Sequence, residues 1–355
     1  MTDLVVADVN KWLGGNHILR GASFTANKGA IVALLGASGS GKTTLLRCIA
    51  GLEQPEKGLI EIGGVAVLDA GRGVALPPEK RNIGLCFQSY ALWPHRSVFD
   101  NVAYGLKLRG VGADEQRRRV ESILSKMGLG HLGARFPDQL SGGQQQRVAI
   151  CRALVYEPKV LLMDEPLSNL DAKLREDARY WIRKLILEVG ICAIMVTHDQ
   201  EEALAIADDV LLLENGVIVQ QGAPQEIYTR PNSFYAADFL GANNVLAGRL
   251  AGGGDAAAIE GEGWRLDGVV RERAPLSAGA TVRAVVRTER LRVVDGDGPN
   301  RLRMTLDASL YLGSAWEYRL SRGELALKAH GETQHAPGEV WCEIPRDAVW
   351  IFAGA

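Results

Sequence analysis

A glycine-rich loop near the start of the sequence has the composition of a phosphate-binding site. It follows the apolar run 31–35, precedes a stretch with helical periodicity, and fits the pattern G-x-x-x-x-G-K-[ST]. Glycines let the backbone wrap around phosphate groups, and N–H groups at a helix start face an anion. In this pattern the Lys reaches the β- and γ-phosphates of a nucleotide, and the next hydroxyl ligates Mg²⁺. The residues expected in the site are Gly36, Ala37, Ser38, Gly39, Ser40, Gly41, Lys42, Thr43 and Thr44.

Two acidic residues end a second apolar run. Asp164 and Glu165 follow Val160–Met163, a short continuous run of the kind that forms a buried strand. A strand that delivers an Asp beside a phosphate loop can hold Mg²⁺, and the next carboxylate can polarise an attacking water. A strand ending in two acids is common by itself, so the interpretation depends on the glycine-rich loop in the same chain. The two segments together predict hydrolysis of a nucleoside triphosphate.

The elements that must position these residues alternate along residues 1–240. Short apolar runs, typical of strands buried on both faces of a sheet, are found at 31–35, 160–163, 191–196 and 210–213. Helical patterns are found at 43–50, 114–127, 143–156, 172–189 and 199–207. This alternation predicts an α/β domain with a mainly parallel central sheet.

The character of the sequence changes after Asn243. Short alternating runs are separated by turn residues and lie at 281–287, 308–312, 317–320 and 324–327. They predict a small all-β, barrel-like domain over residues 243–355. The length of 355 residues also favours two domains.

Composition narrows the class of protein. The net charge of −2 gives no bulk attraction to nucleic acid, so we expect no nucleic-acid partner. The five cysteines are scattered without a CxxC pair, which argues against zinc or disulfides and favours a reducing compartment. Cys86 and Cys151 lie among apolar residues and are expected to be small buried hydrophobes. We expect no signal peptide, because the sequence starts without a basic segment followed by an apolar one. We expect no membrane span, because no uncharged apolar run approaches ~18 residues.

A third motif lies in the middle of the first domain. The segment Leu140-Ser141-Gly142-Gly143-Gln144 precedes a helical stretch, so Ser141 can cap the helix together with Gln144. The same helix start can bind an anion. With the motifs above, this segment resembles the LSGGQ signature of the ATP-binding subunits of ABC transporters. The resemblance extends over most of the first domain and implies ATP as the substrate.

The resemblance also implies roles for single residues. Gln88 matches the Q-loop glutamine, Asp171 the D-loop aspartate and His198 the switch histidine. Glu165 would be the general base, with Gln88 and His198 as the other catalytic residues. Mg²⁺ would be held by Thr43, Gln88 and Asp164, and ATP would contact Ser141, Gly142, Gly143, Gln144 and Asp171 besides the first loop.

The residue that contacts adenine is a departure from the family pattern. Members usually stack an aromatic residue near the N-terminus on the base, and counting back from Lys42 to that position reaches Leu13. The neighbouring residue is Trp12. Either a small shift lets Trp12 stack on adenine, or Leu13 packs on it, and we favour Trp12.

The resemblance further implies domains and partners. It predicts a P-loop ABC ATPase domain over 1–240, with a helical signature subdomain at about 89–157, and an OB-like (TOBE) domain over 243–355. Two copies would face head to tail as a homodimer and bind ATP between them. Transmembrane permease subunits would dock on residues 89–98, and a periplasmic or extracellular solute-binding protein would complete the complex. The chain would then be peripheral, on the cytoplasmic face of the inner membrane.

The branch of the family with this C-terminal domain serves importers. The segments Tyr90–His95 and Leu76–Arg81 are most similar to importers of ferric iron and polyamines. Alternatives are a phosphonate, sulfate, molybdate or sugar importer with a ligand-regulated C-terminal domain, or an exporter. ABC-type ATPases of DNA repair carry long coiled-coil insertions between the two phosphate-binding motifs, and no sustained heptads occur there in this sequence.

Overall fold

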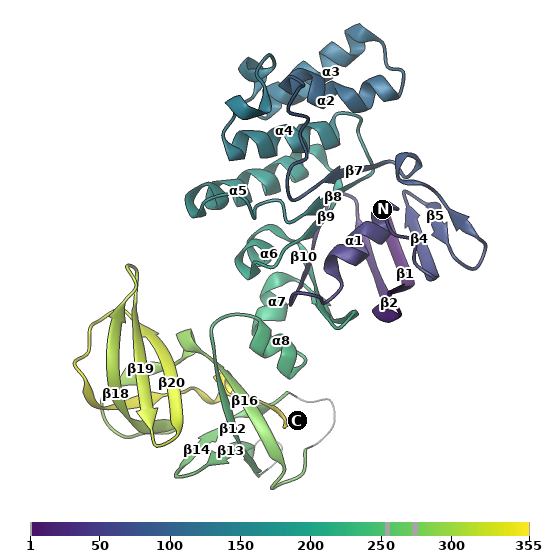
Figure 1. The fold of residues 1–355 in the computed structure, drawn as a ribbon. Helices are drawn as coiled ribbons and strands as arrows, with labels where there is room; N and C mark the ends of the chain where they lie inside the picture. The colour runs from purple at the N-terminus through teal and green to yellow at the C-terminus, as the bar shows by residue number, and fades with distance from the viewer. Residues whose placement is uncertain (1, 253–255, 272–275, 355) are drawn as a thin grey trace. The chain divides into compact units, whose positions relative to one another are not determined.

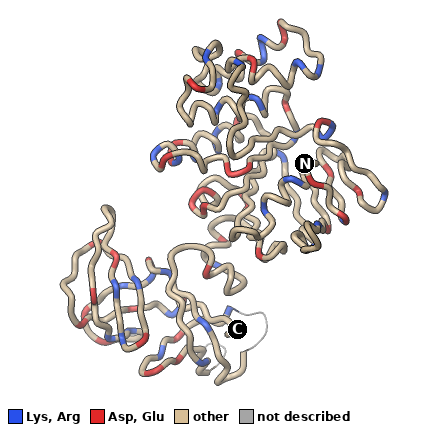
Figure 2. The backbone as a smooth tube through the Cα atoms, viewed as in Figure 1, with Lys and Arg blue, Asp and Glu red and all other residues tan. Residues whose placement is uncertain are grey.

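A computed structural model of the chain describes residues 2–252, 256–271 and 276–354 (Figure 1). The chain divides into two units, Met1–Gln225 and Glu226–Ala355. Basic and acidic residues are interspersed along both units (Figure 2).

A six-stranded sheet in the order β11-β10-β3-β9-β8-β7 forms the centre of the first unit. Neighbouring strands run parallel except for β10 and β11. The strands are β3 (Ile31–Gly36), β7 (Ile83–Cys86), β8 (Val160–Asp164), β9 (Cys192–Val196), β10 (Asp209–Glu214) and β11 (Val217–Gly222). β3 and β9 are buried along their whole length, as their unbroken apolar sequences require. The predicted mainly parallel central sheet is confirmed.

A second sheet of the first unit is antiparallel and has the order β2-β1-β4-β5-β6, which the sequence reasoning missed. Its strands are β1 (Thr2–Leu13), β2 (Asn16–Asn27), β4 (Lys57–Ile62), β5 (Val65–Asp69) and β6 (Val74–Ala75). Helix α1 (Lys42–Ala50) shares a core with both sheets, because Leu45 and Ile49 cluster with Leu19 of β2 and Ile194 of β9. This packing holds the start of α1 beside the end of β3.

Three helices form a separate helical region next to the edge strand β7 (Figure 1). They are α2 (Val98–Leu108), α3 (Ala113–Lys126) and α4 (Gly142–Leu154). Ser97 begins α2 by accepting a hydrogen bond from the backbone N–H of Asp100 at 3.1 Å. The helical patterns predicted α3 and α4 to within two residues and missed α2. Helix α5 (Ala172–Val189) has its predicted bounds, and α6 (Gln200–Ile206) is one residue shorter at each end than predicted.

The second unit is built from two sheets, in the orders β14-β13-β12-β16-β22-β15 and β17-β21-β18-β19-β20. Their strands are β12 (Asn243–Ala251), β13 (Ala258–Gly261), β14 (Trp264–Asp267), β15 (Val269–Val270), β16 (Thr281–Arg287), β17 (Arg292–Val294), β18 (Arg301–Tyr311), β19 (Trp316–Arg322), β20 (Leu325–Gly331), β21 (Gly338–Glu343) and β22 (Trp350–Ala353). One apolar core joins the sheets, with Val282 and Ile351 from the first and Leu306 and Leu320 from the second. The predicted all-β architecture is confirmed and is compatible with an OB-like domain.

Two short helices, α7 (Pro224–Thr229) and α8 (Phe234–Phe239), lie near the junction of the units. In α8, Ala237 packs with Val285 and Phe352 of the second unit. The predicted division into 1–240 and 243–355 assigns α8 to the first domain, and that division stays a prediction.

Candidate active site

The loop between β3 and α1 folds around its own lysine. Lys42 Nζ donates hydrogen bonds to the carbonyl oxygens of Gly36 and Ala37, both at 2.8 Å, and lies 3.4 Å from Ser40 Oγ. Burial lowers the pKa of Lys42, although the carboxylates of Glu165 and Asp164 oppose the shift. Lys42 is therefore a cation held by neutral carbonyl oxygens, and an incoming phosphate is a stronger partner for it.

Glycine is required at several positions of this loop. Gly39 and Gly41 have φ values of 79° and 103°, which side chains with a Cβ rarely adopt. At Gly36 an added Cβ would overlap the carbonyl oxygen of Leu213. Gly41 also begins α1, since the N–H of Leu45 donates to its carbonyl oxygen at 2.9 Å. The backbone path that surrounds Lys42 thus depends on the glycines that the sequence pattern contains.

Two oxygen ligands lie side by side at the start of α1 and the end of β8. Thr43 Oγ1 donates to Asp164 Oδ1 at 3.5 Å. Burial raises the pKa of Asp164, and Glu165 beside it adds to the rise. A divalent cation would oppose that shift, and Mg²⁺ prefers hydroxyl, carboxylate and other oxygen ligands. Thr43 and Asp164 therefore fit a Mg²⁺ site, and the third predicted ligand, Gln88, stays a prediction.

Glu165 is held by two other predicted catalytic residues. Gln88 Nε2 donates to Glu165 Oε2 at 2.9 Å, and His198 Nδ1 lies 3.1 Å from Glu165 Oε1. The three residues follow β7, β8 and β9, whose carboxyl ends meet at one edge of the parallel sheet. Glu165 has a positive φ of 45°, and its N–H donates to the carbonyl oxygen of Val196 at 2.9 Å. The structure thus brings the three residues together around one carboxylate.

The signature segment begins α4, in the helical region (Figure 1). The predicted cap is confirmed: Ser141 Oγ accepts from the N–H of Gln144 at 3.3 Å, and Gln144 Oε1 accepts from the N–H of Ser141 at 2.9 Å. An added Cβ at Gly142 would contact Leu170, and one at Gly143 would meet open space. Within one copy the start of α4 therefore lies near the D-loop.

The D-loop, Ser168–Asp171, has two local tasks in the structure. Asp171 begins α5 by accepting a hydrogen bond from the N–H of Leu174 at 2.9 Å. Asn169 Nδ2 donates to the carbonyl oxygen of Gln88 at 2.6 Å. The D-loop is therefore tied to the residue that holds Glu165.

Neither candidate for the adenine contact is settled by the geometry. The ring of Trp12 stacks on His17, with ring centres 4.0 Å apart and the planes 6° from parallel. One face of the indole is thus covered within the chain. Leu13 is 39% exposed. The choice of Trp12 over Leu13 stays a prediction.

The segment after Gln88 borders a groove of about 440 Å³. Phe87, Trp93 and Tyr104 contribute to its lining, so its surface is largely apolar and aromatic. Tyr90 is only 5% exposed and belongs to the interior. Arg152 holds the segment in place by donating to the carbonyl oxygens of Tyr90, at 2.7 Å, and Ala91.

Sequence reasoning missed two contacts of this site. The bond from Asn169 to Gln88 joins residues 81 positions apart, and Arg175 of α5 reaches both the D-loop and the segment after His198. The Asn in the D-loop, where Ala is common in the family, was the signal that could have drawn attention to the first. The buried environment expected for Cys86 and Cys151 is confirmed, and burial raises the pKa of the Cys86 thiol to about 12.

Comparisons with known proteins agree with this geometry. Residues 19–168 match the family described as ABC transporter. The chain is 43% identical over 340 residues to the Fe(3+) ions import ATP-binding protein FbpC of Agrobacterium fabrum, covering 95% of this chain and 93% of that protein. It is 41% identical to FbpC of Pasteurella multocida, over 88% of this chain and 86% of that protein.

A solved structure is also similar. It is CbiO1 of Clostridium perfringens, part of the ABC transporter complex CbiONQ, with a TM-score of 0.58 and 32% identity. The match covers 64% of this chain and 90% of CbiO1. Across the described residues, no helix is long and apolar enough to cross a membrane. The chain belongs to the ABC transporter family, as one of its ATP-hydrolysing subunits.

Proposed function

We propose that this chain hydrolyses ATP to drive the import of ferric iron through a separate permease. The observation that carries the proposal is the position of Glu165, with Gln88 on one carboxylate oxygen and His198 on the other. A carboxylate held in this way is oriented to accept a proton from water. The likeness to FbpC over nearly its whole length supports the importer role.

The catalytic steps are assigned to residues at the carboxyl edge of the parallel sheet. Glu165 acts as the general base and takes a proton from the attacking water. Gln88 orients Glu165 and the water. His198 donates a hydrogen bond to the γ-phosphate and stabilises the negative charge that is redistributed during cleavage. This division of tasks is supported by the hydrogen bonds that join the three side chains.

Phosphate binding is assigned to the loop Gly36–Thr44. Lys42 exchanges its carbonyl partners for the β- and γ-phosphates, and the backbone N–H groups at the start of α1 face the same anion. Thr43, Asp164 and Gln88 would hold Mg²⁺. That ion would neutralise phosphate charge.

ATP is proposed to bind between two copies of the chain. One helix start contacts only part of a triphosphate, and the start of α4, Ser141–Gln144, offers a second anion-binding helix start. The open space beside Gly143 leaves room for a nucleotide to approach it. Asp171 would then link the two sites, and hydrolysis would separate the copies.

The permease is proposed to dock in the groove beside Trp93. Its apolar and aromatic lining suits the insertion of a short helix from a membrane subunit. The chain would lie on the cytoplasmic face of the inner membrane, with a solute-binding protein on the far side. We assign residues 1–240 to the ATPase domain and 243–355 to a TOBE domain.

The role in iron import is tested by uptake of ⁵⁵Fe(III) in cells that carry either the normal chain or Glu165→Gln in place of it. We expect the variant to lose iron uptake while polyamine uptake is unchanged. Loss of polyamine uptake with normal iron uptake would transfer the proposal to polyamines. Normal uptake of both would show that this chain drives neither iron import nor polyamine import.

The catalytic assignment is tested with the purified chain. We expect Glu165→Gln to bind ATP, to form a stable dimer in its presence, and to hydrolyse ATP at least about 100-fold more slowly. Size-exclusion chromatography with and without ATP follows the dimer, and phosphate release follows turnover. Near-normal turnover would exclude Glu165 as the base.

A further inference from the structure

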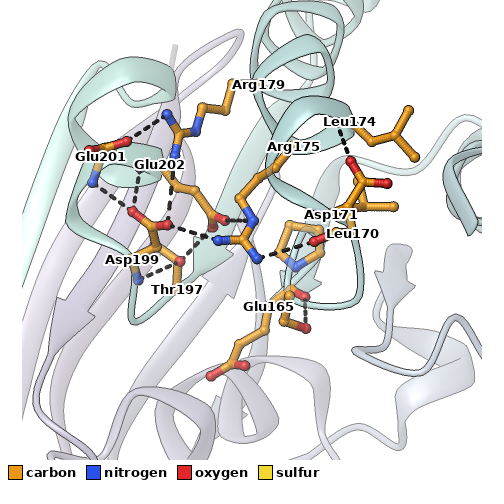
Figure 3. A network of polar contacts seen from close by, with 12 residues as sticks. Glu165, Leu170, Asp171, Leu174, Arg175, Arg179, Thr197, Asp199, Glu201 and Glu202 are labelled. Carbon is orange, nitrogen blue, oxygen red and sulfur yellow. Dashed lines mark hydrogen bonds and ion pairs between the residues drawn. The ribbon is translucent and has the colours of Figure 1, made fainter. Parts of the chain in front are cut away.

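Three arginines on one face of α5 join it to the segment that follows His198. Arg175, Arg179 and Arg183 recur every four residues and each forms an ion pair with a carboxylate between positions 199 and 208. Figure 3 shows Arg175 and Arg179 directed from α5 toward this segment. The proposed catalytic steps use none of the three.

Arg175 differs from its neighbours because it also reaches the D-loop. Its Nη2 donates to the carbonyl oxygen of Leu170 at 3.2 Å, and its Nη1 donates to Asp199 Oδ2 at 3.4 Å. Its Nε lies 3.7 Å from Glu202 Oε1. Leu170 precedes the D-loop aspartate, and Asp199 directly follows His198. One planar guanidinium group therefore bridges the D-loop and the segment that carries His198 (Figure 3).

The segment around His198 is anchored by buried groups on both sides. Thr197, 1% exposed, donates from Oγ1 to Glu202 at 2.6 Å, and Glu202 is 3% exposed. The N–H of Asp199 donates back to Thr197 Oγ1 at 3.0 Å. Because Thr197 and Asp199 flank His198, these bonds limit where its ring can lie. The position of the ring beside Glu165 thus depends on the carboxylates that Arg175 holds.

We infer that Arg175 is a positioning residue that couples the D-loop to His198 and, through His198, to Glu165. The inference rests on the proposed function, in which the D-loop faces the second copy and Glu165 is the general base. A displaced D-loop carries the Leu170 carbonyl with it, and the guanidinium passes that displacement to Asp199 and Glu202. Arg175 therefore acts on turnover rather than on ATP affinity, since it does not belong to the phosphate-binding loop.

The test compares Arg175→Ala and Arg175→Lys with Arg179→Ala in the purified full-length chain. Arg179 is the matched control because it joins the same helices, 3.0 Å from Glu201 and 3.6 Å from Asp199, without reaching the D-loop carbonyl. We expect kcat to fall about 10-fold for Arg175→Ala, with KM for ATP within about 2-fold of normal. Arg175→Lys keeps the positive charge without the planar guanidinium, and its kcat should fall about 4-fold. Arg179→Ala should stay within about 2-fold.

A second measurement separates positioning from general loss of structure. In a His198→Ala background, adding Arg175→Ala should change kcat less than about 2-fold, because its route to Glu165 is already cut. Equal fold losses in both backgrounds, or equal losses for Arg175→Ala and Arg179→Ala, would overturn the inference. If Arg175→Ala does not fold, Arg175→Lys decides, and normal kcat in that variant overturns the inference. A normal chain that does not hydrolyse ATP would overturn the proposed function instead.

Discussion

Lys42 of the first unit and Arg287 of the second are buried cations that are held in different ways. In the first unit, Lys42 is held by carbonyl oxygens of its own loop, beside carboxylates at the open end of the sheet. In the second unit, Arg287 is 2% exposed and lies over the rings of Tyr228 and Trp350. Its guanidinium donates to the carbonyl oxygens of Ala237 and Tyr228 at 3.1 and 3.2 Å.

Lys42 is placed to bind a ligand, whereas Arg287 is part of a packed core. The partners of Lys42 can be exchanged for phosphate without unpacking anything. The partners of Arg287 are Asn243 Oδ1 and backbone carbonyl oxygens of α7 and α8, so the guanidinium ties both helices to β16 in addition to the apolar packing of Ala237 on Val285. Substitution of Lys42 should therefore alter turnover, and substitution of Arg287 should alter stability.

Arg287→Ala should give the largest change in stability. It removes the hydrogen bonds to the carbonyl oxygens of Ala237 and Tyr228 and to Asn243 Oδ1, together with the packing over the rings of Tyr228 and Trp350. We therefore expect the free energy of unfolding of the second unit to fall by about 3 kcal/mol. Urea denaturation measures the change, and limited proteolysis identifies the unit that opens. Arg290→Ala is the control, because Arg290 forms an exposed ion pair with Asp347 at 2.8 Å and should change stability by less than ~1 kcal/mol. Unchanged stability with reduced ATP turnover would contradict the structural role assigned to Arg287.

Trp12→Ala should weaken ATP binding about 5-fold, because it removes the proposed stacking partner of adenine. Leu13→Ala is the matched variant at the neighbouring position. Titration with a fluorescent ATP analogue measures both affinities. A larger loss for Leu13→Ala would assign the adenine contact to Leu13, and unchanged affinity in Trp12→Ala would exclude Trp12.

Local sequence was enough to predict much of the first unit. The loop Gly36–Thr44, the two acidic residues Asp164 and Glu165 at the end of β8, and the cap at Ser141 are each set by adjacent residues, so their structure follows from short-range chemistry. Helix α5 has both of its predicted ends because Asp171 caps its start and Gly190 ends it with a positive φ of 67°. The order of the motifs then gave the family and the candidate catalytic residues.

The rest depends on contacts between distant positions. The antiparallel sheet was missed although β1 and β2 are twelve residues long and β2 alternates regularly from Ala22 to Asn27. The buried positions of β1 follow one another irregularly around several bulges in its pairing with β2. The bond between Asn169 and Gln88 and the bridge through Arg175 join residues far apart in the chain. Side-chain reach and the packing of α5 decide such contacts, and no short motif encodes them.

Asn169→Ala should reduce turnover about 3-fold, because the carbonyl of Gln88 loses its tie to the D-loop while Gln88 itself remains. The stability of the first unit should change by less than ~1 kcal/mol. Lys173→Ala, an exposed position in the first turn of α5, serves as the control and should leave both quantities unchanged. A destabilised variant with normal turnover would show that Asn169, like Arg287, contributes to stability and not to turnover.

The smallest effects are expected at Glu202, a buried carboxyl group of the first unit. Burial raises the pKa of Glu202, with a further rise from Asp199, although the hydrogen bond from Thr197 and the charges of Arg175 and Arg179 oppose the shift. The folded chain therefore holds this proton more tightly than the unfolded chain. As pH rises above the ordinary value of 4.5, the unfolded chain releases its proton first and folding stability is lost.

Glu202→Gln removes that loss and keeps an acceptor for Thr197. We expect its Tm at pH 7 to exceed the normal value by about 2 °C. The difference should shrink as pH falls toward 4.5, and thermal unfolding scans across that range measure it. Turnover should fall by up to about 2-fold, because Arg175 loses one of its carboxylates. A lower Tm at pH 7 would contradict this prediction, since Glu202 would then stabilise its unit as Arg287 does. A higher Tm with lower turnover would mean that Glu202 lowers the stability of the first unit but is needed to position Arg175.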